Sequence, residues 1–221
     1  EVLPVSSVVD QQILEGLSER TARGEGTCVG RPLKRVEARI LPIVEGEMGI
    51  EYLDRSLSAG EIGEIVVTGP SVTKAYDQLP DATRLSKIWE EDRVWHRIGD
   101  LGYFDAEGLL WFCGRKVERV LAGDRVFYTD RCEGVFNTHS RVFRSALIGV
   151  KGQPAIVVEP MPGEYPKSED DKTAFVSELK ELGARSEVTR EIEVFLFKEK
   201  FPVDVRHNAK IHRLTLAKEF G

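Results

Sequence analysis

The feature that most constrains this chain is a stretch of alternating apolar and polar residues, WHRIGDLGYFDAEGLLWFCGRK, at residues 95–116. Such alternation indicates half-buried strands, and the turn composition of residues 105–108 predicts a hairpin. Gly99 interrupts the first strand, so we expect Asp100 at a strand end rather than inside a strand. An ionised carboxylate there can accept hydrogen bonds from two vicinal hydroxyls, as the acidic residue of dinucleotide-binding sites does for ribose, and Arg115 can supply matched donors nearby.

The spacing within this stretch resembles that of a known family, the adenylate-forming enzymes, which comprise acyl-CoA synthetases, peptide-synthetase adenylation domains and luciferases. The segment IGDLGYFDAEGLLWFCGRK is similar, without gaps, to the family signature GD-LG-x-x-D-x-x-G-x-L-x-x-x-GR. The resemblance implies that Asp100 holds the ribose hydroxyls of ATP and that Arg115 contacts the nucleotide just before an interdomain hinge. The alternative is a surface hairpin whose acidic turn keeps the chain soluble.

A second informative stretch is FPVDVRHNAKIHR, at residues 201–213, which resembles the family ending P-K-x-x-x-G-K-I-x-R. It places Lys210 on a loop immediately before a helix. A lysine there is a mobile point charge that can meet both a carboxylate oxygen and the α-phosphate as charge develops in an in-line displacement. We therefore interpret Lys210 as catalytic, and we expect positioning and charge neutralisation by Lys210 and magnesium to lower most of the barrier. The alternative is a solvated basic tail.

The beginning of the chain also bears on the nucleotide. The first residue is Glu1 rather than Met, so we expect a piece of a longer polypeptide. The opening EVLPVSS resembles the end of the family's Y-G-x-T-E segment, which implies that Glu1 helps to hold magnesium and phosphate. The sequence contains no Gly/Ser/Thr-rich phosphate loop, so we do not expect it to turn over ATP by itself.

The order of patterns predicts an α+β chain in two parts. Closely spaced strands with turn signals predict a small twisted sheet or barrel in residues 1–115, with a short packing helix at Val9–Arg20. The family resemblance implies that residues 1–115 are the distal, β-barrel-like part of a large N-terminal adenylation domain. Within that part, GEIGEIVVTGPSVTKAY resembles a structural segment of the family. Residues 116–119 are the expected hinge, with Val117 where the family often has Asp or Lys. Residues 120–221 predict a small α+β C-terminal lid domain with a three-stranded sheet.

The lid is predicted in more detail from its periodicity. Its expected strands and first helix are Val142–Val150, Ala155–Glu159, Glu193–Phe197 and the helix Cys132–His139. Ser168-x-x-Asp171 resembles a capping box that opens a second helix, and a last helix is expected to begin near Ile211.

Composition excludes several classes of protein. A net charge of -6 leaves no global basic face, so we expect no nucleic-acid or anionic-membrane partner, and no apolar run is long enough to span a bilayer. The cysteines Cys28, Cys113 and Cys132 are odd in number and lack C-x-x-C spacing, which favours a reducing compartment, by default the cytoplasm, over a disulfide framework or zinc site. The histidines lack metal-ligand spacing.

One cysteine and two tryptophans could be taken for functional residues, but we interpret all three as structural. Cys113 follows two aromatic residues on the expected hairpin, so we interpret it as a buried structural thiol and not as a nucleophile. Trp89 and Trp95 are interpreted as core aromatics rather than as ligand-stacking residues.

Three segments, CEGVFNTHSRVFRSALIGV, FPVDVRHNAKIHR and WHRIGD, resemble one branch of the family, the β-lactone synthetases of bacterial long-chain olefin biosynthesis. That resemblance implies ATP and Mg²⁺, a long-chain β-hydroxy acid whose hydroxyl expels AMP, and a pathway enzyme or a second copy as partner. The segment LAGDRVFYTDRCE follows the CoA-channel pattern only loosely, so a fatty-acid CoA ligase stays open. A silent binding or scaffold fragment is disfavoured by the joint presence of Asp100, Arg115 and Lys210.

Overall fold

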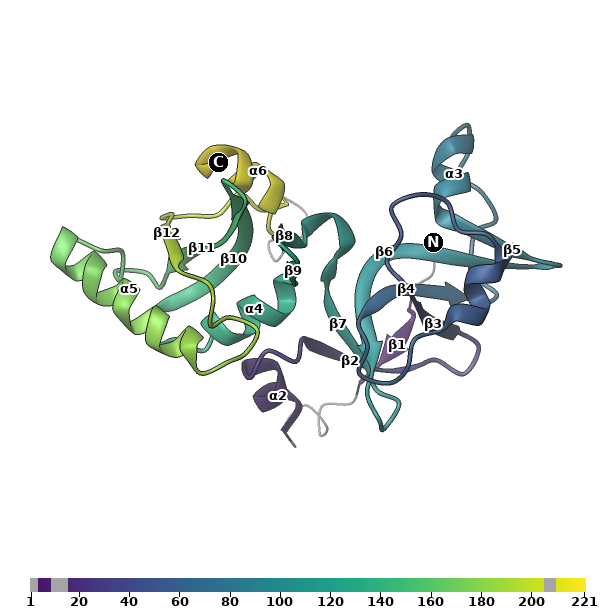
Figure 1. Ribbon diagram of the computed structural model, residues 1–221, viewed down its shortest axis with the longest axis horizontal. Helices are drawn as coiled ribbons and strands as arrows, with labels where there is room; N and C mark the ends of the chain where they lie inside the picture. The colour runs from purple at the N-terminus through teal and green to yellow at the C-terminus, as the bar shows by residue number, and fades with distance from the viewer. Residues whose placement is uncertain (1–3, 9–15, 205–209) are drawn as a thin grey trace. The chain divides into compact units, whose positions relative to one another are not determined.

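The structure is a computed structural model that describes residues 4–8, 16–204 and 210–221 (Figure 1). It divides into two compact units. The first unit comprises the described residues up to Leu17 together with Thr27–Val117, and the second unit comprises Ser18–Gly26 and Glu118–Gly221. The expected helix at Val9–Arg20 lies mostly outside the described residues, and α2 occupies Ser18–Ala22. The described helices include none with the length and apolar character needed to cross a membrane.

The first unit is built on a curled, half-barrel sheet of seven strands, all paired antiparallel. The order is β1-β2-β7-β6-β4-β3, with β5 paired to β6. The strands are β1 (Ser6–Ser7), β2 (Thr27–Pro32), β3 (Glu37–Leu41), β4 (Gly63–Thr68), β5 (Lys87–Glu90), β6 (Arg93–Phe104) and β7 (Leu110–Arg115). Two short helices join them, η2 (Ile50–Arg55) and α3 (Pro80–Ser86). The β-rich first part expected from the sequence is confirmed.

Side chains are buried on both faces of this sheet. On β4, Ile65 and Val67 pack with Leu110 on one face, and Val66 packs with Leu41 and Trp95 on the other. This explains the unbroken apolar run of β4, because alternate residues of a strand point to opposite faces and here neither face is left to solvent.

The second unit is an α+β arrangement around a three-stranded sheet in the order β10-β11-β12. The pair β10–β11 is antiparallel and the pair β11–β12 is parallel. Its strands are β8 (Val120–Ala122), β9 (Arg125–Phe127), β10 (Val142–Val150), β11 (Gln153–Pro160) and β12 (Val194–Phe197), and its longer helices are α4 (Thr129–Phe136), α5 (Glu169–Ala184) and α6 (Arg213–Phe220). The turn η3 (Lys116–Glu118) precedes β8. The three-stranded sheet and its helices are thus confirmed, although α4 lies three residues before the expected Cys132–His139 and α6 begins at Arg213 rather than near Ile211.

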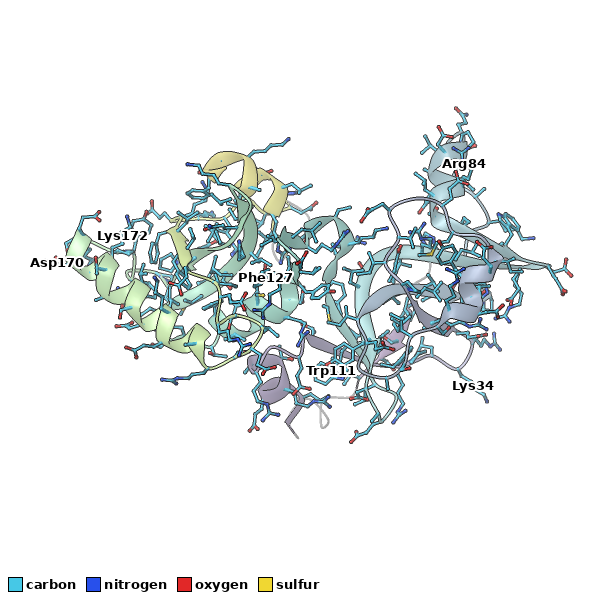
Figure 2. All side chains as sticks on the ribbon, in the orientation of Figure 1. Lys34, Arg84, Trp111, Phe127, Asp170 and Lys172 are labelled. Carbon is cyan, nitrogen blue, oxygen red and sulfur yellow. The ribbon has the colours of Figure 1, made fainter. Side chains whose placement is uncertain are left out.

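Helices cover the three-stranded sheet on both faces. Ile156 and Val158 of β11 pack with Phe175 and Leu179 of α5, whereas Val157 packs with Leu216 of α6. Each unit therefore has its own interior, as the side chains in Figure 2 illustrate with Trp111 in the first unit and Phe127 in the second. The expected cap of α5 is present, because Ser168 Oγ accepts a hydrogen bond from the Asp171 amide at 3.1 Å.

Candidate functional site

The structure brings together the acid and the base predicted to hold a nucleotide. Asp100 of β6 and Arg115 of β7 are direct cross-strand partners. Arg115 Nη1 lies 2.9 Å from Asp100 Oδ1, and it also donates to the Ile98 carbonyl at 2.9 Å. The Asp100 side chain is 25% exposed and the Arg115 side chain 47% exposed, so both reach solvent. The pair presents an anionic acceptor and a planar set of donors side by side.

The expectation that Asp100 sits at a strand end is wrong. β6 runs without interruption through Asp100, from Arg93 to Phe104. The pairing with β4 steps from Arg97 directly to Leu101 while β4 advances by only two residues, and Gly99 has a φ of +76°. The interruption is therefore a bulge within a continuous strand, and Asp100 directly follows its glycine.

A buried charge network lies beneath this bulge. Arg97, next to it on β6, has a side chain only 4% exposed, and it forms a two-point ion pair with Glu64 of β4 through bonds of 3.1 and 2.8 Å. The remaining Arg97 donors reach the main-chain carbonyls of Gly46, Leu85 and Val44 at 2.6, 2.8 and 2.8 Å. All five N–H donors of a guanidinium are thereby used, which is what a buried arginine requires.

Lys116 completes this network directly after Arg115. Its ammonium lies 3.3 Å from Glu64 Oε2 and also donates to the Val44 carbonyl. Glu64 thus ties together three motif segments, since Glu64 lies in GEIGEIVV, Arg97 in WHRIGD and Lys116 in CGRK. Sequence reasoning assigned the first segment a structural role but did not find these partners. The available signal was an acidic residue inside an apolar strand.

Lys210 lies in the second unit, where the sequence placed it, just before α6. Val203 and Ile211 form an antiparallel bridge, and the Asp204 amide donates to the Lys210 carbonyl at 3.0 Å. The His212 amide donates to the Pro202 carbonyl at 2.9 Å. These bonds hold the main chain on either side of Ile211, and the Lys210 side chain is exposed.

The burial of Arg213 argues against the alternative of a solvated basic tail at this residue. Its side chain is 15% exposed and forms a two-point ion pair with Glu133, at 2.7 and 2.6 Å. Its third nitrogen, Nη1, lies 3.0 Å from Glu118 Oε2. Burial opposes the charge on Arg213, but the two carboxylates outweigh it and hold the pKa of Arg213 above its usual value. Burial likewise raises the pKa of Glu133, to about 7, against the opposing effect of Arg213.

Comparison with known proteins gives close relatives over almost the whole chain. The chain is 43% identical over 227 residues to the olefin beta-lactone synthetase of Xanthomonas campestris pv. campestris, and 42% identical over 222 residues to that of Stenotrophomonas maltophilia. Both matches cover 98% of this chain and 40% of the relative. Among solved structures, an ATP-bound RpMatB-BxBclM chimera matches with a TM-score of 0.71 and 26% identity, over 87% of this chain and 36% of that one. The chain belongs to the adenylate-forming superfamily.

The family and the α+β fold expected from the sequence are thus confirmed. The chain spans about 40% of the length of the curated relatives it matches. No protein-family model matches it.

The magnesium site expected from the sequence stays a prediction. Glu1, expected to help hold magnesium, lies outside the described residues. Within residues 4–8, 16–204 and 210–221, His, Cys, Asp and Glu side chains form no group of three that could hold a metal ion.

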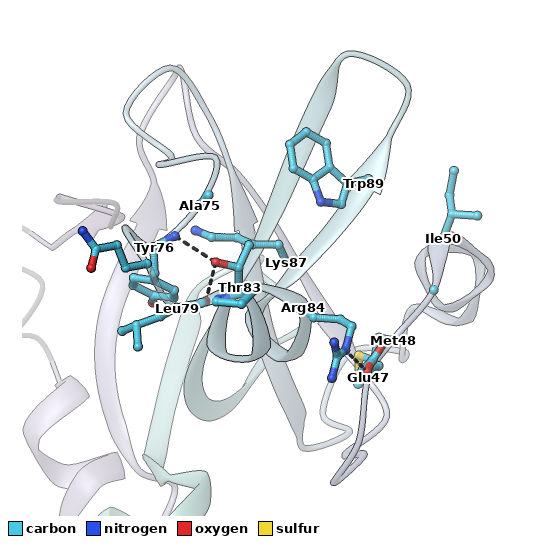
Figure 3. Close-up of a pocket in the computed structure, with 13 residues that line it drawn as sticks. Glu47, Met48, Ile50, Ala75, Tyr76, Leu79, Thr83, Arg84, Lys87 and Trp89 are labelled. Carbon is cyan, nitrogen blue, oxygen red and sulfur yellow. Dashed lines mark hydrogen bonds and ion pairs between the residues drawn. The ribbon is translucent and has the colours of Figure 1, made fainter.

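Trp89 and Trp95 lie on opposite faces of the β5–β6 hairpin. Trp95 is fully buried, as expected, but Trp89 is 51% exposed, so the core assignment of Trp89 is wrong. The cause is cross-strand pairing: Ile88 lies opposite Trp95 and shares its face, which turns the next residue, Trp89, to the other side. There Trp89 is one of the residues that line a pocket of about 670 Å³, as is Lys87. Figure 3 draws the lining side chains. Cys113 is fully buried, as expected for a structural thiol.

Proposed function

We propose that this chain is the C-terminal portion of an ATP-dependent, AMP-forming enzyme that converts a long-chain β-hydroxy acid to a β-lactone through an acyl-adenylate. The observation that carries the proposal is the pairing of Asp100 with Arg115 on the bulge of β6, at 2.9 Å and within reach of solvent. The 43% identity over 98% of the chain to an olefin beta-lactone synthetase supports the choice of reaction.

The geometry at Asp100 suits the ribose of ATP. A carboxylate has about four acceptor positions on its two oxygens, so an ion pair with Arg115 is compatible with accepting hydrogen bonds from both ribose hydroxyls. Asp100 lies on the bulge, and the buried Arg97–Glu64 pair fixes the strand that carries it. Rigid support of this kind holds the nucleotide in one orientation, which is what an in-line displacement needs.

The first step is transfer of the adenylyl group. A carboxylate oxygen of the acid attacks the α-phosphorus of ATP, and the bond from that phosphorus to the bridging oxygen breaks, so pyrophosphate leaves with the electron pair. Negative charge gathers on the α-phosphate oxygens in the transition state, and Lys210 neutralises it.

The second step closes the ring. The β-hydroxyl oxygen of the same acyl chain attacks the acyl carbon, the bond from that carbon to the AMP oxygen breaks, and the hydroxyl proton passes to solvent. AMP leaves and a four-membered lactone remains. No thiol is consumed, so the reaction proceeds without CoA.

Magnesium would supply charge neutralisation on the phosphates of ATP. The described residues do not offer a fitting set of ligands, so no step here passes through the ion.

The decisive experiment incubates the full-length protein with ATP, magnesium and a long-chain β-hydroxy acid, with and without CoA. We expect AMP and lactone in the absence of CoA. Strict CoA dependence would instead identify a thioester-forming ligase, and an absence of AMP with every acid tested would identify a non-catalytic scaffold.

Two substitutions test the assigned roles. Asp100→Ala is expected to raise the KM for ATP on the order of 10-fold to 100-fold, because a hydrogen bond to a charged group contributes about 1.5–3 kcal/mol. Lys210→Ala is expected to lower kcat by about 100-fold to 1000-fold while the protein stays folded. Lys200→Ala, an exposed lysine of the same unit, is the matched control. A wild-type rate in Lys210→Ala would remove Lys210 from the site.

A further inference from the structure

One side chain joins the expected hinge, residues 116–119, to the segment that carries Lys210. Arg213 binds Glu118, the first residue after Val117, at 3.0 Å. With its other two nitrogens it binds Glu133 of α4 at 2.7 and 2.6 Å. Glu133 in turn accepts the Leu147 amide of β10 at 2.9 Å. The beginning of α6 is therefore connected to α4, to the central sheet and to the beginning of the second unit.

The main chain between Lys210 and Arg213 is held in place by packing and hydrogen bonds. Ile211 is 6% exposed and packs with Ala146 and Ile148 of β10. It also pairs with Val203, and the main chain on both sides of it is hydrogen-bonded. Because Lys210 is only three residues before Arg213, an orientation imposed on Arg213 is passed to the main chain of Lys210.

The ion pairs of Arg213 with Glu118 and Glu133 are better suited to orienting the Arg213 side chain than to stabilising the fold. Replacing a buried ion pair by apolar side chains of similar volume is often neutral or stabilising, so such a network is weak evidence for a contribution to folding. A guanidinium paired in two-point fashion is instead held in one plane and one direction, which an apolar side chain would not achieve.

We propose that Arg213 is a positioning residue that fixes Lys210 for adenylyl transfer by linking its segment to Glu118 and Glu133. The proposal rests on the proposed function, because it assumes that Lys210 acts on the α-phosphate. It assigns Arg213 no contact with the substrates. Its effect on the reaction is exerted through Lys210 alone.

The test measures ATP–pyrophosphate exchange, which reports adenylyl transfer, in the full-length protein. Arg213→Met is expected to lower kcat on the order of 100-fold, as misplacement of a catalytic group by about 1 Å can do. The KM for ATP should change by less than about 3-fold, because Asp100 and Arg115 are untouched. Arg141→Met is the matched control, since Arg141 also bridges two carboxylates in the second unit, Glu164 and Asp171, and is similarly buried.

The double variant with Lys210→Ala decides between positioning and general damage. If Arg213 acts through Lys210, adding Arg213→Met to Lys210→Ala lowers the rate by less than about 3-fold further. A further loss of about 100-fold, equal to that in the wild-type background, would overturn the proposal. Glu118→Gln, which removes one charge and keeps the shape, gives the same comparison if Arg213→Met does not fold.

A second measurement is independent of activity. Amide hydrogen exchange of residues 211–216 is expected to accelerate in Arg213→Met and to remain unchanged in Arg141→Met. Unchanged exchange in Arg213→Met would also overturn the proposal. If the wild-type protein shows no pyrophosphate exchange with any acid, the proposed function fails, and hydrogen exchange still tests whether Arg213 holds this segment in place.

Discussion

Glu64 is the residue whose removal should destabilise the first unit most clearly. Its carboxylate, 3% exposed, faces two cations that are themselves buried, Arg97 at 4% and Lys116 at 11% exposure. Breaking a buried ion pair from one side costs about 3–5 kcal/mol, because the remaining charge is left without compensation. Glu64→Gln keeps an amide oxygen as an acceptor, so we expect a loss of about 3 kcal/mol, at the low end of that range.

Tryptophan fluorescence makes this loss measurable in the first unit alone. The chain has three tryptophans, Trp89, Trp95 and Trp111, and all of them lie in that unit. With a urea dependence of about 1–3 kcal/mol per molar, a loss of about 3 kcal/mol moves the unfolding midpoint down by about 1–3 M. Circular dichroism at the helix wavelength follows chiefly the second unit, which holds the long helix α5, for comparison.

Glu37→Gln is the matched control for Glu64→Gln. Glu37 also faces two arginines, Arg39 at 3.0 Å and Arg93 at 2.6 Å, but its side chain is 43% exposed. Burial opposes ionisation even there, yet the two arginines outweigh it and lower the pKa of Glu37. Exposed pairs contribute about 0–1 kcal/mol, so this control should move the midpoint little. Equal midpoint shifts in the two variants would refute the reasoning that burial sets the cost.

Two further predictions use other parts of the chain. Gly102→Ala should destabilise the first unit by about 2–3 kcal/mol in the same urea assay, because the new Cβ would lie 2.2 Å from a main-chain carbonyl of β7, whereas Gly46→Ala, which meets no atom within 4 Å, should have almost no effect. Among the thiols, Cys28 should react rapidly with a disulfide reagent in the native protein, and Cys113 and Cys132 only after unfolding, since both are buried and burial raises the pKa of Cys132 to about 12. Rapid labelling of all three thiols in the native protein would contradict this.

The sequence was sufficient for the pairing of Asp100 with Arg115, because a motif with fixed spacing specifies which residues meet across a hairpin. It was not sufficient for the geometry of the strand. A glycine that interrupts an alternating pattern is equally consistent with a turn and with a bulge, and the difference depends on whether the neighbouring strand continues past it. Here β4 continues, so β6 does too.

Burial of charged and aromatic side chains was the least predictable property. Arg213 follows a run of polar and basic residues, so its neighbours suggest a solvated face, and only the distant Glu118 and Glu133 explain its burial. Trp89 was misassigned for a related reason, since the face on which a strand residue lies depends on its cross-strand partner. Lys210 could be placed before α6 from its motif, but its role in the reaction remains a prediction.

The two buried charge networks lie on either side of a single residue. Lys116 is held by Glu64 and Glu118 by Arg213, whereas Val117 between them is 73% exposed. If residues 116–119 act as the expected hinge, we predict that a rotation that preserves both networks is concentrated in the φ and ψ torsions of Val117. A β-branched residue occupies few backbone basins, chiefly helical and extended. A joint at Val117 would therefore alternate between two backbone conformations. Val117→Gly would remove this restriction and allow many more conformations at the joint.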